Sequence, residues 1–121
     1  MNEGTKFDQG KAPLSMLPWV AIEQIAQVLA YGAHKYGRDN WLQGMKLTRV
    51  VDAALRHTYK WAWGEDIDEE SGLPHLAHAA VNLLFLLTYT QAKVGTDDRI
   101  KIPKIAYLAT PVIIALPRPE Q

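Results

Sequence analysis

Apolar side chains recur with helical spacing early in the chain. Ile22, Ile25, Ala26, Leu29 and Ala33 follow the i, i+3, i+4, i+7, i+11 pattern of an amphipathic helix. The spacing predicts a helix over residues 18–35. Residues 1–14 contain three Gly or Pro breakers, so we expect an extended arm there.

A second helix is predicted over residues 48–63. Thr48 is its expected N-cap, and Gly64 is expected to stop it. Residues three and four apart share one face of a helix, so this helix has a charged face and a largely apolar one. The charged face carries Arg49, Asp52, Arg56 and Lys60, and the apolar face carries Val51, Ala54, Thr58 and Ala62.

A third helix is predicted over residues 74–92, with Pro74 suited to its first turn. Its leucines and alanines cover most of the circumference, which a helix tolerates when it is buried on several sides. In so short a chain this favours a partner subunit. His75, His78 and Asn82 form a polar strip on this apolar helix.

The C-terminal segment has prolines at positions 103, 111, 117 and 119, which argue against a long helix. The stretch VIIAL within it is expected to be a short strand or an arm on a neighbour. The fold class predicted is therefore all-α: a small antiparallel bundle of three main helices, completed by oligomerisation. We expect one domain over 1–121, with a core over 15–92 and a tail over 93–121.

Composition narrows the functional classes. The 13 basic residues balance 13 acidic ones, unlike the basic excess of a protein that binds polymeric nucleic acid. Cysteine is absent, which excludes thiolate metal sites and suits a cytoplasmic setting. The longest apolar run, over 76–90, falls short of the roughly 20 residues that cross a bilayer, so no membrane partner is expected.

The connection between the second and third helices concentrates titratable groups. If these helices are antiparallel, four carboxylates converge with His75 and His78, while Arg56 and His57 stand one or two turns away. Crowded carboxylates repel one another unless a cation neutralises them, and oxygen ligands favour Mg²⁺ or Mn²⁺. An ion beside cationic side chains is typical of phosphoryl chemistry. The four carboxylates are Glu65, Asp68, Glu69 and Glu70.

Simpler readings of the same residues stay open. An acidic run is often a solvated turn that places negative charge at a helix N-terminus. His75 alone could be a capping histidine, and His78 with Asn82 could be a hydrogen-bonded pair inside the bundle.

The segment YGAHKYGRDNW forms a second candidate region. Its Lys35, Tyr36, Arg38, Asn40 and Trp41 offer phosphate charge, stacking and amide hydrogen bonds, which suit a nucleotide. The alternative is that the two aromatic side chains only close the end of the bundle. In the arm, Lys11 could reach a phosphate.

Three blocks carry a family resemblance: KFDQGKAPLSMLP, YGAHKYGRDNW, and RHTYKWAWGEDIDEESGLPHLAHAAVNLLFL. Together they resemble the phage and bacterial dATP/dGTP diphosphohydrolase family (N-terminal domain type), related to the all-α MazG-like nucleoside triphosphate pyrophosphohydrolases. The likeness covers roughly residues 6–90. The chain departs from the MazG pattern of Glu-Glu-x-x-Glu and Glu-x-x-Asp, because it has Arg56-His57 and His75-x-x-His78 instead.

The resemblance implies hydrolysis of purine deoxynucleoside triphosphates, dATP and dGTP, to the monophosphate and diphosphate with Mg²⁺ or Mn²⁺, in a homo-oligomer, a dimer or tetramer. Glu65 and His78 are the predicted catalytic residues. The predicted metal ligands are Glu65, Asp68, Glu69, Glu70 and His75. The predicted substrate-binding residues are Lys11, Lys35, Tyr36, Asn40, Trp41, Arg56, His57 and Asn82.

Other nucleotide hydrolases are excluded by missing motifs. No histidine is followed by Asp, no Arg-Glu occurs, and no Gly-Lys precedes Ser or Thr, so the HD, Nudix and P-loop signatures are absent. A non-catalytic nucleotide-binding or structural oligomer is the alternative from a different class.

Overall fold

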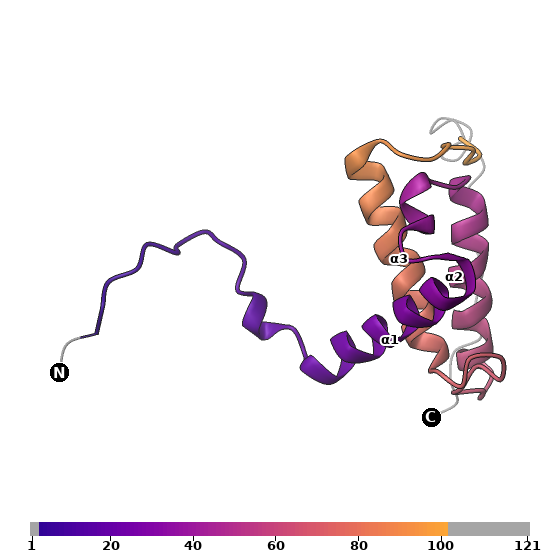
Figure 1. The fold of residues 1–121 in the computed structure, drawn as a ribbon, viewed down its shortest axis with the longest axis horizontal. Coiled ribbons are helices and arrows are strands. Elements are labelled where there is room, and N and C mark those ends of the chain that lie inside the picture. Colours follow the sequence, from indigo (N-terminus) through magenta and orange to yellow (C-terminus); the bar gives the residue numbers. More distant parts are fainter. Residues whose placement is uncertain (1–2, 102–121) are drawn as a thin grey trace, which may run out of the picture.

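The computed structural model describes residues 3–101, and its helices agree with the expected all-α bundle (Figure 1). Three α-helices, α1 (Trp19–Tyr36), α2 (Leu47–Ala62) and α3 (His75–Ala92), are accompanied by two short 3-10 helices, η1 (Leu14–Met16) and η2 (Asn40–Gln43). Each α-helix begins and ends within one residue of the bounds that the sequence predicts. The described residues contain no strand beyond two isolated bridges.

The helices α2 and α3 run antiparallel, and α1 packs across α3 (Figure 1). One core cluster joins α1 to α3 through Val28, Ala77 and Val81. A second joins α2 to α3 through Leu47, Val50 and Tyr89. These contacts set the spaces between the three helices where a site can form.

The predicted inner faces of the first two helices are only partly correct. On α1, Ile25 and Leu29 pack against the core as expected, but Val28 is the buried residue and Ala26 is exposed. On α2 the inward stripe is Leu47, Val50 and Ala54, of which only Ala54 was expected. This stripe continues at helical spacing to His57, which therefore points toward α3.

The start of α2 is capped from the far end of the described chain, which corrects the expectation that Thr48 is the N-cap. The backbone N–H and the hydroxyl of Thr48 both donate to the carboxylate of Asp98. The segment after α3 returns to the start of α2, where Thr96 exchanges backbone hydrogen bonds with Met45 and Leu47.

The close approach of two glycines shapes this return. Both have positive φ, and a Cβ on Gly44 would lie 2.6 Å from the backbone nitrogen of Gly95. Only glycine fits such a contact. The loop before α2 is therefore held by the segment that follows α3.

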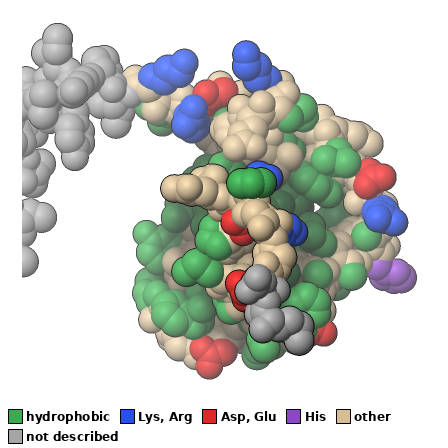
Figure 2. All heavy atoms as spheres, turned by 90° about the vertical axis from the view of Figure 1, so that its left-hand side faces the viewer, with side chains coloured by type: hydrophobic (Ala, Val, Ile, Leu, Met, Phe, Trp, Pro, Cys, Tyr) green, Lys and Arg blue, Asp and Glu red, His purple; other side chains and the backbone are tan. Residues whose placement is uncertain are grey.

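Part of the leucine surface of α3 stays uncovered in the single chain. Leu83 and Leu87 are 59% and 62% exposed, and hydrophobic side chains also occupy much of the face seen in Figure 2. The predicted partner subunit would cover such a surface. No helix among the described residues has the length and apolarity to span a bilayer. The VIIAL stretch lies outside the described residues.

Candidate functional site

The connection between α2 and α3 folds back on itself and carries carboxylates to the start of α3. Gly64 and Gly72 both adopt positive φ there. Backbone hydrogen bonds from Asp68 to Leu73 and from His75 to Asp66 close the turn. The carboxylate of Asp68 accepts hydrogen bonds from the backbone N–H and the hydroxyl of Ser71, at 2.9 and 2.7 Å. This local bonding fixes Asp68 beside α3.

Three histidines meet between α2 and α3, and we call His57, His75 and His78 the histidine cluster. The Nδ1 atoms of His57 and His75 lie 2.8 Å apart. The rings of His57 and His78 stack with centroids 4.5 Å apart and planes 10° apart. His75 is wholly buried and His78 nearly so. The sequence had placed His57 a turn or two away, whereas it contacts both partners directly.

Carboxylates hold two members of the histidine cluster. Glu65 Oε2 lies 2.8 Å from His75 Nε2, and Asp68 Oδ2 lies 3.6 Å from His78 Nε2. The Ser71 hydroxyl lies 2.7 Å from the same His78 nitrogen. The Ser71 hydroxyl donates its proton to Asp68, so it acts as the acceptor for the N–H of His78. The proton of a neutral His78 is therefore on Nε2, and the lone pair is on Nδ1.

Burial governs the charge of these groups. Burial, and the neighbouring His78 and His75, lower the pKa of His57 to about 4, and burial also lowers the pKa of His78. Burial acts to raise the pKa of Asp68, but the hydrogen bonds from Ser71 outweigh it and hold that pKa below its usual range. At neutral pH His57 and His78 are thus neutral, with Asp68 ionised.

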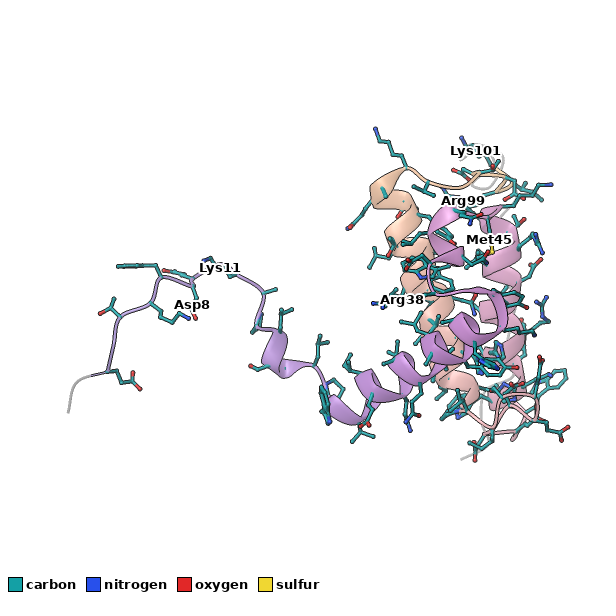
Figure 3. All side chains as sticks on the ribbon, viewed as in Figure 1. Asp8, Lys11, Arg38, Met45, Arg99 and Lys101 are labelled. Carbon is teal, nitrogen blue, oxygen red and sulfur yellow. The ribbon has the colours of Figure 1, made fainter. Side chains whose placement is uncertain are left out.

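The histidine cluster borders a pocket of about 660 Å³ between the three α-helices. This volume lies within the ordinary range for small-molecule sites. Four cationic side chains from α1, the following loop and α2 line the pocket: Lys35, Arg38, Arg49 and Arg56. Figure 3 labels Arg38 beside the packed helices. The pocket therefore combines positive charge with imidazole and carboxylate groups.

Glu70 belongs to the α1 side of the pocket. Its Oε1 accepts hydrogen bonds from Lys35 Nζ at 2.7 Å and from the Tyr31 hydroxyl at 3.0 Å. These two hydrogen bonds lower the pKa of Glu70, and the pairing raises the pKa of Lys35. Glu70 thus ties the acidic connection to α1.

The aromatic side of the pocket is built on Trp41. Its ring stacks on Phe85 with centroids 4.6 Å apart, and the hydroxyl of Tyr89 donates to its backbone carbonyl. Trp41 packs against the core and also lines the pocket. Closing the end of the bundle and facing a ligand are therefore compatible for this residue.

The structure brings most predicted site residues to one place. Glu65 and His75 contact each other beside the pocket, Glu69 is exposed, and Lys11 lies on the projecting arm, away from the packed helices (Figure 3). Sequence reasoning missed the roles of Tyr31 and Ser71. Ser71 three residues after Asp68 in a Gly-containing turn was a usable signal. Lining the pocket are Lys35, Tyr36, Asn40, Trp41, Arg56, His57, Asp68, Glu70, His78 and Asn82.

Fold and site together define an all-α protein with a cationic pocket that ends in a histidine and aspartate group. Residues 1–99 match the family described as dATP/dGTP diphosphohydrolase, N-terminal, and the chain belongs to that family. A relative named dATP/dGTP diphosphohydrolase, from Salmonella phage PMBT28, is 48% identical over 96 residues. The match covers 79% of this chain and 33% of the relative, so the chain spans about a third of that protein. No solved structure matches the chain.

Proposed function

We propose that this chain hydrolyses purine deoxynucleoside triphosphates, dATP and dGTP, to the monophosphate and diphosphate. The observation that carries the proposal is the pocket, which joins four cationic side chains to a partly buried histidine and aspartate group. Phosphate recognition needs positive charge, and phosphoryl chemistry needs groups that handle a proton or hold an ion. The name of the phage relative supports the substrate class.

Different residues of the pocket are suited to different parts of the nucleotide. Arg49 and Arg56 on α2, with Lys35 on α1, are suited to the triphosphate, because guanidinium and ammonium groups neutralise its charge. Tyr36, Asn40 and Trp41, which also line the pocket, are suited to the nucleoside.

The residues present fit a divalent ion at one point. His57, Asp68 and His75 each offer a ligand atom, and these atoms lie within 4.8 Å of one another. A bound ion, Mg²⁺ or Mn²⁺ by the sequence prediction, would neutralise phosphate charge and lower the pKa of a water molecule. Glu65, Glu69 and Glu70 remain predicted ligands, although Glu65 and Glu70 already bond other side chains.

The reaction adds water across one phosphoanhydride bond. The water oxygen bonds to the α-phosphorus, the bond from the α-phosphorus to the bridging oxygen breaks, and diphosphate leaves with that oxygen. A water proton must be accepted as the new bond forms. His78 is the proposed acceptor, because it is neutral, lines the pocket and carries a free lone pair on Nδ1.

A homo-oligomer, dimer or tetramer, is part of the proposal, as is a cytoplasmic setting where such nucleotides occur. The exposed leucines of α3 support the oligomer, since a second copy would remove them from water.

Hydrolysis of individual nucleotides tests the proposal. The chain is incubated with dATP, dGTP and the other common triphosphates in Mg²⁺ or Mn²⁺, and the products are separated by chromatography. We expect diphosphate and the monophosphate, with purine deoxynucleotides favoured. Orthophosphate release would indicate another hydrolase class, and binding without turnover would favour the non-catalytic nucleotide-binding alternative.

A matched pair of variants on α2 sharpens this test. Arg56→Gln removes a cation that lines the pocket, whereas Lys60→Gln removes an exposed cation one turn further along the same helix. We expect a loss of kcat/KM on the order of 100-fold for the first, since charge-assisted phosphate contacts are strong, and little change for the second. Equal effects would contradict the placement of the triphosphate.

A further inference from the structure

The donor atoms that converge beside the pocket are mostly nitrogen. His57 comes from the inner face of α2, His75 from the first turn of α3, and Asp68 from the connection between them. The two Nδ1 atoms lie 2.8 Å apart, although only one of the two can donate a hydrogen bond to the other. A fold that aims two imidazole nitrogens and a carboxylate at one point is suited to a metal ion.

Glu65 determines the tautomer of the buried His75. Its carboxylate accepts but does not donate, so it holds the proton on His75 Nε2, 2.8 Å away. The lone pair of a neutral His75 is then on Nδ1, the atom that faces His57. A carboxylate behind a ligating histidine is a common arrangement in metal sites, where it sets the tautomer and the ring orientation.

The other carboxylates of the connection do not join this point. Glu70 accepts hydrogen bonds from Lys35 and Tyr31 on α1, and Glu69 is exposed. Asp68 is thus the single carboxylate in the converging set. Mg²⁺ prefers a shell of oxygen ligands. Imidazole nitrogen binds Co²⁺ and Zn²⁺ more strongly than Mn²⁺, and it binds all three of these ions more strongly than Mg²⁺.

We propose that His57, Asp68 and His75 bind a first-row transition ion such as Mn²⁺, Co²⁺ or Zn²⁺ in preference to Mg²⁺, with Glu65 as the positioning residue that orients His75. His57 and Asp68 also line the pocket, so the ion lies at its end. The inference deepens the proposed function, on which it rests for the role of the ion. Its test contains no nucleotide, so the ion site and the hydrolysis can fail separately.

Ion binding to the full chain is measured after treatment with a chelator and dialysis. Co²⁺ is titrated while its visible absorption is recorded, and Mn²⁺, Zn²⁺ and Mg²⁺ are titrated by calorimetry. We expect one Co²⁺ per chain and an affinity for Mg²⁺ at least about 100-fold weaker. Equal affinities for Mg²⁺ and Co²⁺ would overturn the proposal.

Variants separate the ligands from the positioning residue. His57→Asn is expected to weaken Co²⁺ binding by more than about 100-fold, and Glu65→Gln by about 10- to 100-fold with a changed Co²⁺ spectrum. His34→Asn, at an exposed histidine on α1, is the control and should bind Co²⁺ as tightly as the wild type does. Urea unfolding of each metal-free variant shows whether its fold is intact. Wild-type binding by His57→Asn would refute the site, and a wild-type affinity and spectrum for Glu65→Gln would refute its role.

Discussion

Tyr89 connects the core of the bundle to the wall of the pocket, and Tyr89→Phe tests that connection. The side chain is 2% exposed, and its hydroxyl donates to the backbone carbonyl of Trp41. Burial raises the pKa of Tyr89, so the hydroxyl stays a donor at neutral pH. Phenylalanine keeps the ring in the core and removes only this hydrogen bond.

The structure indicates how much stability Tyr89→Phe should lose. A buried polar group left without any partner costs about 1–3 kcal/mol. The carbonyl of Trp41 also accepts the backbone N–H of Gly44 at 3.1 Å, so it keeps one partner in the variant. We therefore expect the free energy of unfolding to fall by about 1 kcal/mol, the low end of that range.

Urea unfolding at pH 7 and steady-state kinetics measure the effect of Tyr89→Phe. Trp41 is released only at its backbone, so KM for the nucleotide should rise a few-fold with kcat little changed. Tyr59→Phe, at an exposed tyrosine on α2, is the control and should match the wild type. An unchanged stability, or a loss above about 3 kcal/mol, would refute the reasoning about the shared carbonyl.

Three further predictions concern charge. Because the pKa of His57 is lowered in the folded metal-free protein, the unfolded chain binds a proton at this histidine more readily, and the free energy of unfolding falls as pH falls. We expect a loss of about 2 kcal/mol between pH 7 and 5, measured by urea unfolding in the presence of a chelator. His57→Asn should remove part of that slope, since the lowered pKa of His78 acts in the same direction, and an unchanged slope would contradict the prediction. The pKa of Asp98 is lowered by its hydrogen bonds to Thr48, so its stabilisation of α2 is present above the ordinary carboxyl pKa and lost at lower pH. Asp98→Ala should therefore lower Tm at pH 7 but not at pH 2, with Asp8→Ala, at an exposed carboxylate on the arm, as the control. Glu70→Gln should free Lys35 and lower KM for the nucleotide; a loss of ion affinity in this variant would instead identify Glu70 as a ligand.

Local patterns in the sequence were sufficient for the helices. Apolar spacing and the Gly and Pro breakers act within a few residues, so the bounds of α1, α2 and α3 could be predicted closely. The polar strip of His75, His78 and Asn82 follows from the same spacing. Its position toward the acidic connection follows from the short, antiparallel link between α2 and α3.

Contacts between distant segments decided the remaining features. The sequence of α2 offers more than one apolar stripe, and packing against α3 selected the one that continues to His57. Whether Glu70 faces the histidines or α1 depends on where α1 crosses, because Lys35 and Tyr31 lie more than thirty residues away in the chain. The cap of α2 by Asp98 likewise needs the chain to return after α3. Periodicity specifies which residues share a face of a helix, but only the packing of one helix on another specifies what that face meets.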